Sequence, residues 1–495
     1  MKKALITLIM VCQSLLGMVQ AQEETVQSTQ GKPNIILFFT DDQGYNDVGC
    51  FGSPNIKTPN FDRMAQEGMR FTSAYVGAPV CGPSRAALMT GCYPIRVAEP
   101  QNRKNLHTVP HTKEVMIPEV LKPAGYTSAI LGKWHAGEAK TKGDPRSQGF
   151  DYFFGTPKFN GFTRLISQTR MRSPLLRNET VVTKRIEQKE MNQLTTWYTE
   201  EAIKFITENK EKPFFLYLAH NMPHVPLGVS DKFRGKSKGG FYGDVIEELD
   251  WSMGKILKTL KTLGLDENTL VIFTSDNGPW IEKQIGDHAG HADPLRGSKM
   301  KSWDGGPRVP CIMRWPGKIP AGKVSDAIIT TMDFMPTFAS LAGATLPEDR
   351  MIDGKNILPL MTGQTDQSPH DVYYYYCYTH LHGVRDAQWK LVLPRQAKPA
   401  FMGWWARMID EVKEVQLFDL KNDISETTNV AQQHPEVVKR LMAKIEKARE
   451  ELGDADRIGK GARFFDTEPK RPDIKKVHLA ESHPKKKDRK KRKRE

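Results

Sequence analysis

A cysteine and an arginine four residues apart form the first group in this sequence whose types and spacing suit chemistry. They lie in the stretch Cys81-Gly82-Pro83-Ser84-Arg85-Ala86-Ala87-Leu88-Met89-Thr90-Gly91. Pro83 suits the first turn of a helix and Gly91 suits its end, so we expect Cys81 at a helix N-terminus. Unpaired N–H groups and the helix dipole meet there, and Arg85 adds a cation one turn on, which together favour an anion. Taken alone, Cys81 could be a structural thiol, half of a disulfide, a thiolate nucleophile or a modified residue.

Four apolar runs, typical of strands buried on both faces of a parallel sheet, each lead into polar residues. The runs are residues 34–40, 126–131, 213–219 and 269–274, and the polar groups after them are Asp41 and Asp42, Lys133 and His135, His220 and His224, and Asp276 and Asn277. Because ligands of open α/β sheets bind beyond the carboxyl ends of the strands, we expect these groups at one edge. The acid pairs favour a hard divalent cation, Ca²⁺ more than Mg²⁺, although a turn or helix cap would explain either pair alone.

Two motifs resemble the signatures of the type I sulfatases. Cys81-x-Pro83-Ser84-Arg85-x4-Thr90-Gly91 is similar to the first signature, in which the cysteine is oxidised to Cα-formylglycine. The second signature resembles Gly125-Tyr126-Thr127-Ser128-Ala129-Ile130-Leu131-Gly132-Lys133-Trp134-His135. Residues 417–429 are similar to the C-terminal portion of arylsulfatase-like proteins, so the resemblance covers roughly residues 33–455.

The resemblance implies a metal site and a modified nucleophile. It identifies Asp41, Asp42, Asp276 and Asn277, together with the modified Cys81, as ligands of one Ca²⁺ ion. The aldehyde made from Cys81 hydrates to a diol, and one hydroxyl, polarised by the metal, attacks sulfur, displaces the alcohol and leaves the sulfate on the diol carbon. The second hydroxyl then expels the sulfate, an exit that an ordinary serine ester would lack.

The resemblance also assigns five further side chains to the reaction. Arg85 and Lys133 are implied to steady the diol and the sulfate, His135 to act as base on the second hydroxyl, and His224 and Lys299 to contact sulfate and the leaving oxygen. Residues 295–306 depart from the usual Gly-Lys-Gly-Thr-Thr-Trp-Glu pattern of the family. Counting back from Asp304 selects Lys299 over Lys301 as the lysine of that pattern.

The elements that must position these groups alternate along the chain. Helical periodicity over 59–68, 117–124, 196–209 and 245–263 falls between the apolar runs and predicts a doubly wound α/β core. After Pro369 the pattern predicts antiparallel strands at 373–378, 389–393 and 416–420, and a helix over 435–452. The fold class implied by the resemblance is an alkaline-phosphatase-like sandwich, with a large, mostly parallel central sheet flanked by helices and a smaller C-terminal subdomain with an antiparallel sheet and a helix.

The chain is expected to divide into five segments. These are a secretory signal peptide at 1–21, a linker at 22–32, a catalytic domain at 33–369, a C-terminal subdomain at 370–463 and a disordered polybasic tail at 464–495. With no other run long enough to span a bilayer, the mature protein is predicted to be exported, either periplasmic or secreted. The tail from Lys485 to Glu495 carries +7 of the formal net charge of +14. The remaining excess suggests an anionic substrate without pointing to nucleic acid.

Several other residues keep two interpretations each. Cys50, Cys92, Cys311 and Cys377 could pair as disulfides or be buried thiols. His288 and His291, with Asp287 and Asp293, could bind zinc, yet they resemble a histidine-bearing loop of the family. His380 and His382 could line a sugar subsite or lie on an exposed strand face. The basic segments 157–192 and 230–243 could rim a pocket for a polyanion or be solvated surface.

The function predicted from these patterns is hydrolysis of a sulfate ester, of a carbohydrate in particular, to an alcohol and inorganic sulfate. It requires a formylglycine-generating enzyme, or an equivalent, as a maturation partner. One alternative is a phosphomonoesterase or phosphodiesterase of the same superfamily, which would prefer two metal ions with additional His and Asp ligands. Another is a sulfated-glycan-binding protein without turnover, if Cys81 stays unmodified.

Overall fold

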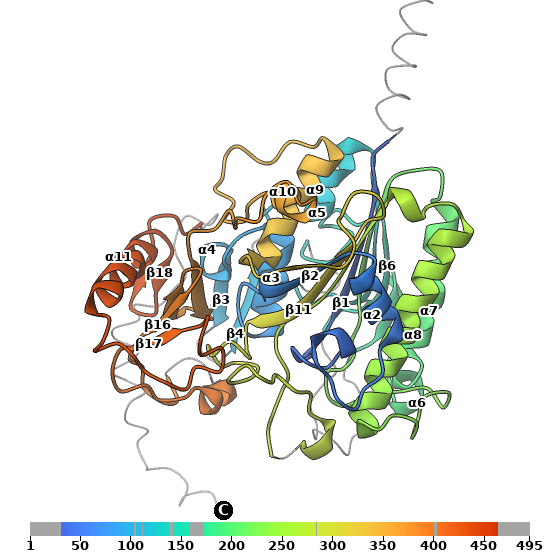
Figure 1. Ribbon diagram of the computed structural model, residues 1–495. Helices are drawn as coiled ribbons and strands as arrows, with labels where there is room; N and C mark the ends of the chain where they lie inside the picture. Colours follow the sequence, from blue (N-terminus) through green and yellow to red (C-terminus); the bar gives the residue numbers. More distant parts are fainter. Residues whose placement is uncertain are drawn as a thin grey trace, which may run out of the picture.

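An eleven-stranded sheet forms the centre of the computed structural model (Figure 1). The structure describes residues 31–102, 105–110, 112–137, 142–158, 173–283, 285–399 and 403–463, so the predicted signal peptide and polybasic tail lie outside it. In spatial order the strands are β12 (Lys323–Ser325), β2 (Met69–Tyr75), β11 (Arg308–Arg314), β10 (Thr269–Ser275), β1 (Asn34–Thr40), β9 (Phe214–Ala219), β5 (Thr127–Lys133), β6 (Tyr152–Thr156), β7 (Leu175–Arg177) and β8 (Thr180–Thr183), with β13 (Ile329–Thr330) beside β2.

The middle of this sheet is parallel. β10, β1, β9, β5 and β6 pair in parallel, whereas β11 runs antiparallel to both β10 and β2. The four strands predicted from apolar runs are β1, β5, β9 and β10, so the prediction of a buried parallel core is confirmed. β2 and β11 were not predicted.

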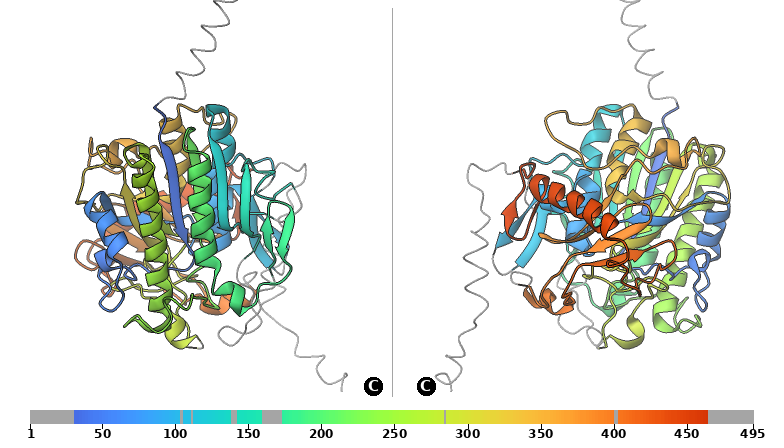
Figure 2. Two further views of the ribbon diagram at one scale, coloured as in Figure 1. Left: turned by 90° about the vertical axis from the view of Figure 1, so that its right-hand side faces the viewer. Right: turned by 60° about the vertical axis from the view of Figure 1, so that its left-hand side comes forward.

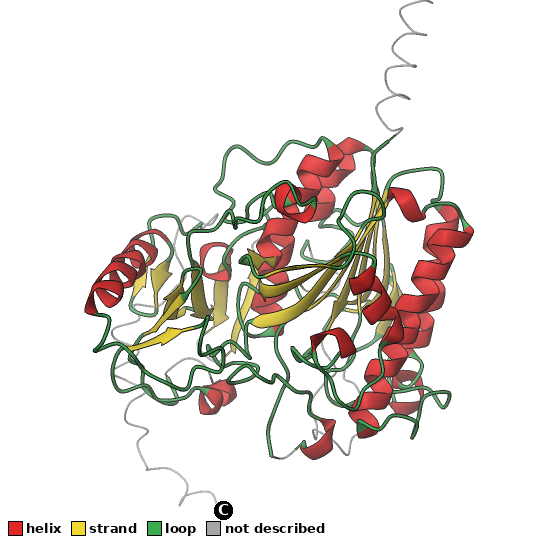
Figure 3. Ribbon diagram, in the orientation of Figure 1, coloured by secondary structure: helices red, strands yellow, loops and turns green. Residues whose placement is uncertain are grey.

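Helices cover both faces of the sheet (Figures 2 and 3). Side chains of α2 (Pro59–Gln66), α7 (Leu194–Glu208) and α8 (Gly240–Thr262) join one hydrophobic cluster with the sheet. The opposite cluster includes side chains of α3 (Cys81–Thr90), α5 (Ile117–Leu121), α9 (Phe334–Ala342) and α10 (Leu358–Met361). The short helices α4 (Pro94–Val97) and α6 (Gln188–Met191) and the hairpin of β3 (Ala98–Asn102) and β4 (Asn105–Pro110) complete this part.

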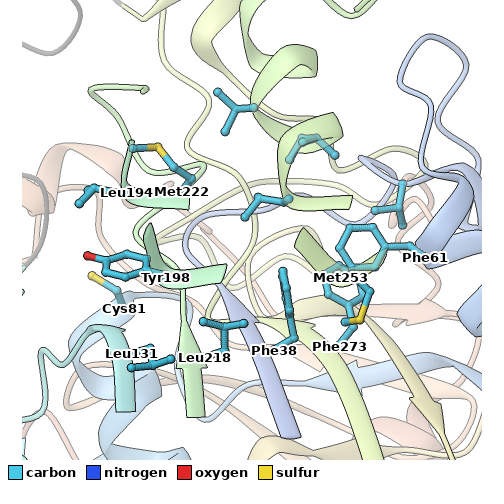
Figure 4. Packing of buried hydrophobic residues seen from close by; sticks show 14 of the residues in the cluster. Phe38, Phe61, Cys81, Leu131, Leu194, Tyr198, Leu218, Met222, Met253 and Phe273 are labelled. Carbon is cyan, nitrogen blue, oxygen red and sulfur yellow. The ribbon is translucent and has the colours of Figure 1, made fainter. Parts of the chain in front are cut away.

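Strand β1 shows why a continuous apolar run is needed at the centre. Ile36 and Phe38 point into the cluster under α2, α7 and α8, while Ile35 and Leu37 point into the opposite cluster. Figure 4 shows Phe38 beside residues of the neighbouring strands, with Cys81 at the margin of the same cluster. Both faces are therefore buried, and the strand has no solvent side for polar residues to occupy.

A second, four-stranded antiparallel sheet follows in the chain. Its order is β14 (Tyr373–Cys377), β15 (His380–Arg385), β16 (Trp389–Val392) and β17 (Gln416–Asp419), and α11 (Pro435–Glu451) packs against it. A small hairpin of β18 (Gly453–Asp454) and β19 (Arg457–Ile458) follows α11. A shared hydrophobic cluster joins this sheet to Tyr75 of β2 and Met332. The predicted antiparallel sheet and helix are confirmed, and β15 is an addition.

Two further predictions concern cysteines and membrane spans. All five cysteines in the described part of the chain are free thiols, so the disulfide interpretation is wrong for Cys50, Cys92, Cys311 and Cys377. The alternative interpretation, a buried thiol, agrees with the structure for Cys92, Cys311 and Cys377, because these three side chains are at most 1% exposed. No helix among the described residues combines the length and apolar character that crossing a bilayer requires.

Candidate active site

The ends of β1 and β10 bring the predicted acidic residues together. The register pairs Thr40 with Ser275, so the residues that follow both strands leave the sheet side by side. The backbone N–H of Asp42 donates to Oδ1 of Asp276 at 3.0 Å, and Nδ2 of Asn277 donates to Oδ1 of Asp42 at 2.7 Å. All four residues, Asp41, Asp42, Asp276 and Asn277, are at most 3% exposed.

Cys81 begins helix α3, as the sequence predicts. Val80 before it is extended, and Gly91 ends the helix in the left-handed conformation with φ of 66°. One potential ligand atom each of Cys81, Asp41 and Asp276 lie within 4.8 Å of one another. The helix N-terminus therefore points its first residue at the acidic ends of β1 and β10.

Three buried cations contact the same carboxylates. Nε and Nη2 of Arg85 donate to Oδ2 of Asp276 at 3.0 and 2.9 Å. Nζ of Lys133, the last residue of β5, lies 2.6 Å from Oδ2 of Asp41. Nζ of Lys299 lies 2.7 and 2.8 Å from the two carboxylate oxygens of Asp42. Each predicted cation thus meets a predicted metal ligand.

Gly132 allows Lys133 to reach this position. Its φ is 115°, and a Cβ at this residue would lie 1.8 Å from the carbonyl oxygen of Ala219. Only glycine tolerates both the conformation and the close approach of β9. The glycine before the lysine in the second motif therefore has a structural reason.

The two predicted histidines lie beside the same carboxylates and cysteine. Nε2 of His224 lies 3.7 Å from Oδ2 of Asp42, and its Nδ1 is 2.5 Å from the carbonyl oxygen of Val225. The ring of His135 adjoins the first turn of α3, since a Cβ at Gly82 would be 3.7 Å from its Cε1. All the predicted site residues are therefore brought to one edge of the sheet.

Burial and charge shift the acid–base properties of the site. Burial raises the pKa of the Cys81 thiol, and the cations of Lys133 and Lys299 oppose that shift. Burial also raises the pKa of Asp276, with the charge of Asp41 acting in the same direction. Burial lowers the pKa of His224 well below its ordinary value, so this imidazole is neutral at pH 7.

Backbone strain marks two of the site residues. Asp42 has φ of 64° and His135 has φ of 56°, conformations that residues other than glycine seldom adopt. Such strain persists only where the surroundings hold the residue, and it concentrates at functional sites. The hydrogen bond from the N–H of Asp42 to Asp276 is one such restraint.

The donor set fits a hard divalent cation. Oδ1 of Asp41 and Oδ1 of Asn277 are buried and accept no hydrogen bond from any described residue. Buried oxygens normally have a partner, and carboxylate and amide oxygens are the ligands that hard cations take. The structure therefore supports a metal site formed by buried acidic groups near Cys81.

The lesser candidates do not join this cluster. Among the described residues, both groups of potential metal ligands include Asp41 and neither includes His288 or His291, so nothing in the structure supports the zinc interpretation. Nδ1 of His291 instead lies 3.1 Å from Oδ1 of the buried Asp47. Part of the first basic segment, 159–172, lies outside the described residues. The described Arg177 of that segment forms an ion pair with Glu201 at 2.7 Å.

His380 and His382 lie on β15, in the smaller sheet. His382 is 2% exposed and its Nδ1 is 2.6 Å from the hydroxyl of Ser302, so the expectation of an exposed strand face is wrong for this residue. The expectation failed because the sequence did not indicate that the loop bearing Lys299 covers β15.

Sequence reasoning missed several buried polar residues at or near the site. Tyr217 of β9 places its hydroxyl 3.3 Å from Nη1 of Arg85. Asp47 accepts hydrogen bonds from Gly44, Tyr242 and His291. Tyr217 sits inside an apolar run and Asp47 in an irregular loop, so neither carries a periodic signal. The side-chain amide of Gln43 is buried without a hydrogen-bond partner among the described residues. Gln43 directly follows the acid pair, and this position in the sequence could have suggested that it lies at the site.

Comparison with known families gives two matches along the chain. A family model described as Sulfatase matches residues 33–344. A second model, described as N-sulphoglucosamine sulphohydrolase, C-terminal, matches residues 299–451. Together they span both sheets of the structure.

Individual proteins resemble most of the chain. An N-acetylgalactosamine-6-sulfatase of Canis lupus familiaris is 41% identical over 362 residues, covering 69% of this chain and 68% of that protein. An N-acetylgalactosamine-6-O-sulfatase of Bacteroides thetaiotaomicron is 33% identical over 498 residues, covering 87% of this chain and 95% of that protein. The crystal structure of Ps i-CgsB in complex with k-i-k-neocarrahexaose matches with a TM-score of 0.70 and 31% identity, covering 84% of this chain and 92% of that chain.

Proposed function

Because the chain belongs to the sulfatase family and is a sulfuric ester hydrolase, we propose that its substrate is a sulfated carbohydrate, which it hydrolyses to an alcohol and inorganic sulfate. One observation carries the proposal: Cys81 at the start of α3 lies within ligand distance of Asp41 and Asp276, and buried cations surround those carboxylates. A nucleophile, a metal site and an anion site thus coincide at one edge of the sheet.

The nucleophile is Cys81 in oxidised form. Burial raises the pKa of its thiol, which is unfavourable for a thiolate nucleophile. Oxidation to Cα-formylglycine by a maturation enzyme removes this difficulty. The hydrate of that aldehyde supplies two hydroxyl groups, one as the nucleophile toward sulfur and the other as the group that later releases sulfate.

Asp41, Asp42, Asp276 and Asn277, with the modified Cys81, would hold one Ca²⁺ ion. Oδ1 of Asp41 and Oδ1 of Asn277 support this assignment, since both are buried and accept no hydrogen bond in the described part of the chain. Nη2 of Arg85 lies 3.9 Å from Oδ1 of Asp41, beyond hydrogen-bond distance. Ca²⁺ tolerates irregular shells of carboxylate and amide oxygens better than Mg²⁺ does. The ion would polarise oxygens of the nucleophile and of the sulfate group.

The remaining side chains bind charge and move protons. Arg85 of α3 and Lys133 of β5 contact the nucleophile and the sulfate group. Lys299 and His224 approach the same groups from the side of Asp42. Cations fixed before the reaction stabilise charge that develops on sulfate oxygens. His135 beside the first turn of α3 takes the proton from the second hydroxyl of residue 81.

The carbohydrate substrate is supported by the relatives and by charge. Two relatives are named for a sulfate on N-acetylgalactosamine, and the similar solved structure contains a neocarrahexaose. The formal net charge that remains outside the C-terminal tail, +7 of +14, suits an anionic substrate. We further propose a catalytic domain at 33–369, a C-terminal subdomain at 370–463, and export directed by residues 1–21.

Two measurements test the proposal. Mass spectrometry of the peptide that contains Cys81, from protein made in its native host, should show formylglycine; an unmodified thiol would favour a binding protein. Purified protein should hydrolyse an aryl sulfate faster than the matching aryl phosphate, and preference for phosphate would favour the phosphatase alternative. Release of sulfate from N-acetylgalactosamine 6-sulfate, compared with its 4-sulfate, then tests the substrate class.

A further inference from the structure

The loop that carries Lys299, residues 294–306, is extensively hydrogen-bonded to the C-terminal part of the chain, residues 370–463. The hydroxyl of Ser425 donates to the carbonyl oxygen of Pro294 at 2.7 Å, and Nη1 of Arg296 donates to the carbonyl oxygen of Glu426 at 2.9 Å. Further contacts of this lysine loop with the C-terminal part join Met300 to Cys377, Lys301 and Trp303 to Asp410, Ser302 to His382, and Asp304 to Tyr375, Lys390 and Glu426. The large sheet also contacts the loop, through Tyr75 and Arg308 on Asp304.

Asp304 is the centre of these contacts. It is fully buried, and its Oδ1 accepts hydrogen bonds from the hydroxyl of Tyr375 at 2.6 Å and from Nζ of Lys390 at 3.1 Å. Its backbone N–H donates to Oε2 of Glu426 at 2.7 Å, and Lys390 also lies 2.5 Å from Oε1 of Glu426. Oδ2 of Asp304 accepts from the hydroxyl of Tyr75 at 2.8 Å and from Arg308 at 3.1 Å, so Asp304 joins the lysine loop to both sheets. A buried network of this kind fixes geometry, because each lost hydrogen bond weakens the solvation of a buried charge.

The conformation of Met300, next to Lys299, shows that the loop is held under strain. Its φ is 71°, which is unfavourable for a residue with a side chain, and it is fully buried. Its N–H donates to the carbonyl oxygen of Pro79, while its own carbonyl oxygen accepts from Sγ of Cys377 at 3.4 Å. The first contact comes from the part that carries the nucleophile and the second from the small sheet.

We propose that the C-terminal part of the chain positions Lys299 for catalysis, acting through Tyr375, Lys390 and Glu426 on Asp304. This inference rests on the proposed function, in which Lys299 contacts the sulfate group. Asp304 lies five residues after Lys299 in a loop whose two ends approach each other, since the N–H of Gly305 donates to the carbonyl oxygen of Arg296 at 2.7 Å. A shift of Asp304 therefore moves the whole loop, and with it the ammonium that contacts Asp42.

The proposal gives the small sheet a specific role. The Nζ of Lys299 is held at 2.7 and 2.8 Å from Asp42, so the ammonium is already placed before substrate binds. Catalytic groups lose efficiency when they are displaced by as little as an ångström. Tyr375, Lys390 and Glu426 are positioning residues in this sense, because none of them is among the groups around Cys81.

Tyr375→Phe and Tyr376→Phe form a matched pair of tests. Both tyrosines are on β14 and at most 1% exposed, but the hydroxyl of Tyr376 donates to the carbonyl oxygen of Gly453 at 2.8 Å, away from the lysine loop. Each variant removes one buried hydroxyl from the same hydrophobic cluster. Because Tyr375 donates to a carboxylate and Tyr376 to a carbonyl, the melting temperature of each variant is measured beside its activity. We expect Tyr375→Phe to lower kcat/KM for a sulfate ester about tenfold, and Tyr376→Phe to lower it less than about twofold.

A double-mutant cycle with Lys299→Met separates positioning from general destabilisation. If Tyr375 acts through Lys299, then Tyr375→Phe should change the residual activity of Lys299→Met by less than about twofold, because the group that it positions is gone. An undiminished tenfold loss in that background would overturn the proposal. Equal losses for Tyr375→Phe and Tyr376→Phe in the wild-type background would do the same.

Hydrogen exchange of peptides from residues 294–306 gives a readout that does not depend on turnover. Tyr375→Phe should increase exchange in this loop, whereas Tyr376→Phe should leave it unchanged. If the wild-type protein hydrolysed no sulfate ester but the exchange pattern held, the proposed function would fail and the positioning of the loop would stand. Unchanged exchange in Tyr375→Phe would refute the positioning itself.

Discussion

The buried histidine His220 should make the stability of this protein fall in mild acid. It follows β9, is fully buried, and its ring lies 4.6 Å from that of Phe38 and 6.0 Å from that of Tyr198. Neither ring nitrogen has a hydrogen-bond partner among the described residues. Burial lowers the pKa of His220 from 6.5 to about 3, because a charged imidazole cannot be solvated there.

The sign and size of the effect follow from that shift. The unfolded chain takes up the proton below pH 6.5, but the folded chain does so only near pH 3. The contribution of His220 to the free energy of unfolding is therefore complete above pH 6.5 and is lost as the pH falls from 6.5 towards 3. At pH 5 the loss amounts to about 2 kcal/mol, at 1.36 kcal/mol for each pKa unit.

The assay is urea unfolding at pH 7 and pH 5, with wild type, His220→Phe and a control. His220→Phe keeps an aromatic ring against Phe38 and cannot titrate, so the difference between the two pH values should shrink by about 2 kcal/mol. His434→Asn is the matched control, since its side chain is 39% exposed beside α11. It should keep the wild-type difference within about 0.5 kcal/mol. An unchanged pH difference in His220→Phe would refute the argument from burial.

Three further predictions concern the site itself. Lys299→Met should lower kcat at least about 100-fold. Lys301→Met should lower kcat no more than about tenfold, because Nζ of Lys301 pairs with Asp410 at 3.0 Å. The reverse order in steady-state assays would show that the wrong lysine was chosen. Cys81→Ala should abolish turnover while the melting temperature in calorimetry stays within about 4 °C, and substantial unfolding would contradict a chemical role. Ca²⁺ should raise the melting temperature of the wild type, and Asn277→Ala should weaken that response; no response in the wild type would count against the metal site.

The residues that follow buried strands could be predicted from the sequence. The apolar runs of β1 and β10 mark strands that are buried on both faces, and the first polar residues after each run mark the end of the strand. Asp41 and Asp276 could therefore be predicted at the edge of the sheet from their positions in the sequence. Their contact also follows from the sheet, because the parallel register of β1 and β10 brings the two strand ends level. The place of Arg85 one turn after Cys81 in α3 was predicted as well, but its hydrogen bonds to Asp276 were not.

Contacts between distant segments could not be predicted in this way. Asp304, Lys390 and Glu426 are separated by tens of residues, and nothing in the local pattern of any of them indicates that they share a buried network. β2 and β11 were missed for a related reason. Arg70 interrupts the apolar pattern of β2, and the short apolar run of β11 contains Pro310 and is bounded by Arg308 and Arg314. Arg308 and Arg314 find ion-pair partners in Asp304 and Glu67 that only the folded chain provides.

The charge balance of the site explains why a metal and an anion should bind together. In formal charge the buried side chains of Asp41, Asp42, Asp276, Arg85, Lys133 and Lys299 sum to zero, because three are carboxylates and three are cationic. Each cation has a carboxylate partner within 3 Å, and a sulfate ester would compete with that carboxylate for the same N–H donors. A divalent cation on the carboxylates would reduce their hold on the lysines and leave a net charge of about +2, which a sulfate group complements. A divalent cation held by the carboxylates would therefore favour binding of the sulfate group by Arg85, Lys133 and Lys299.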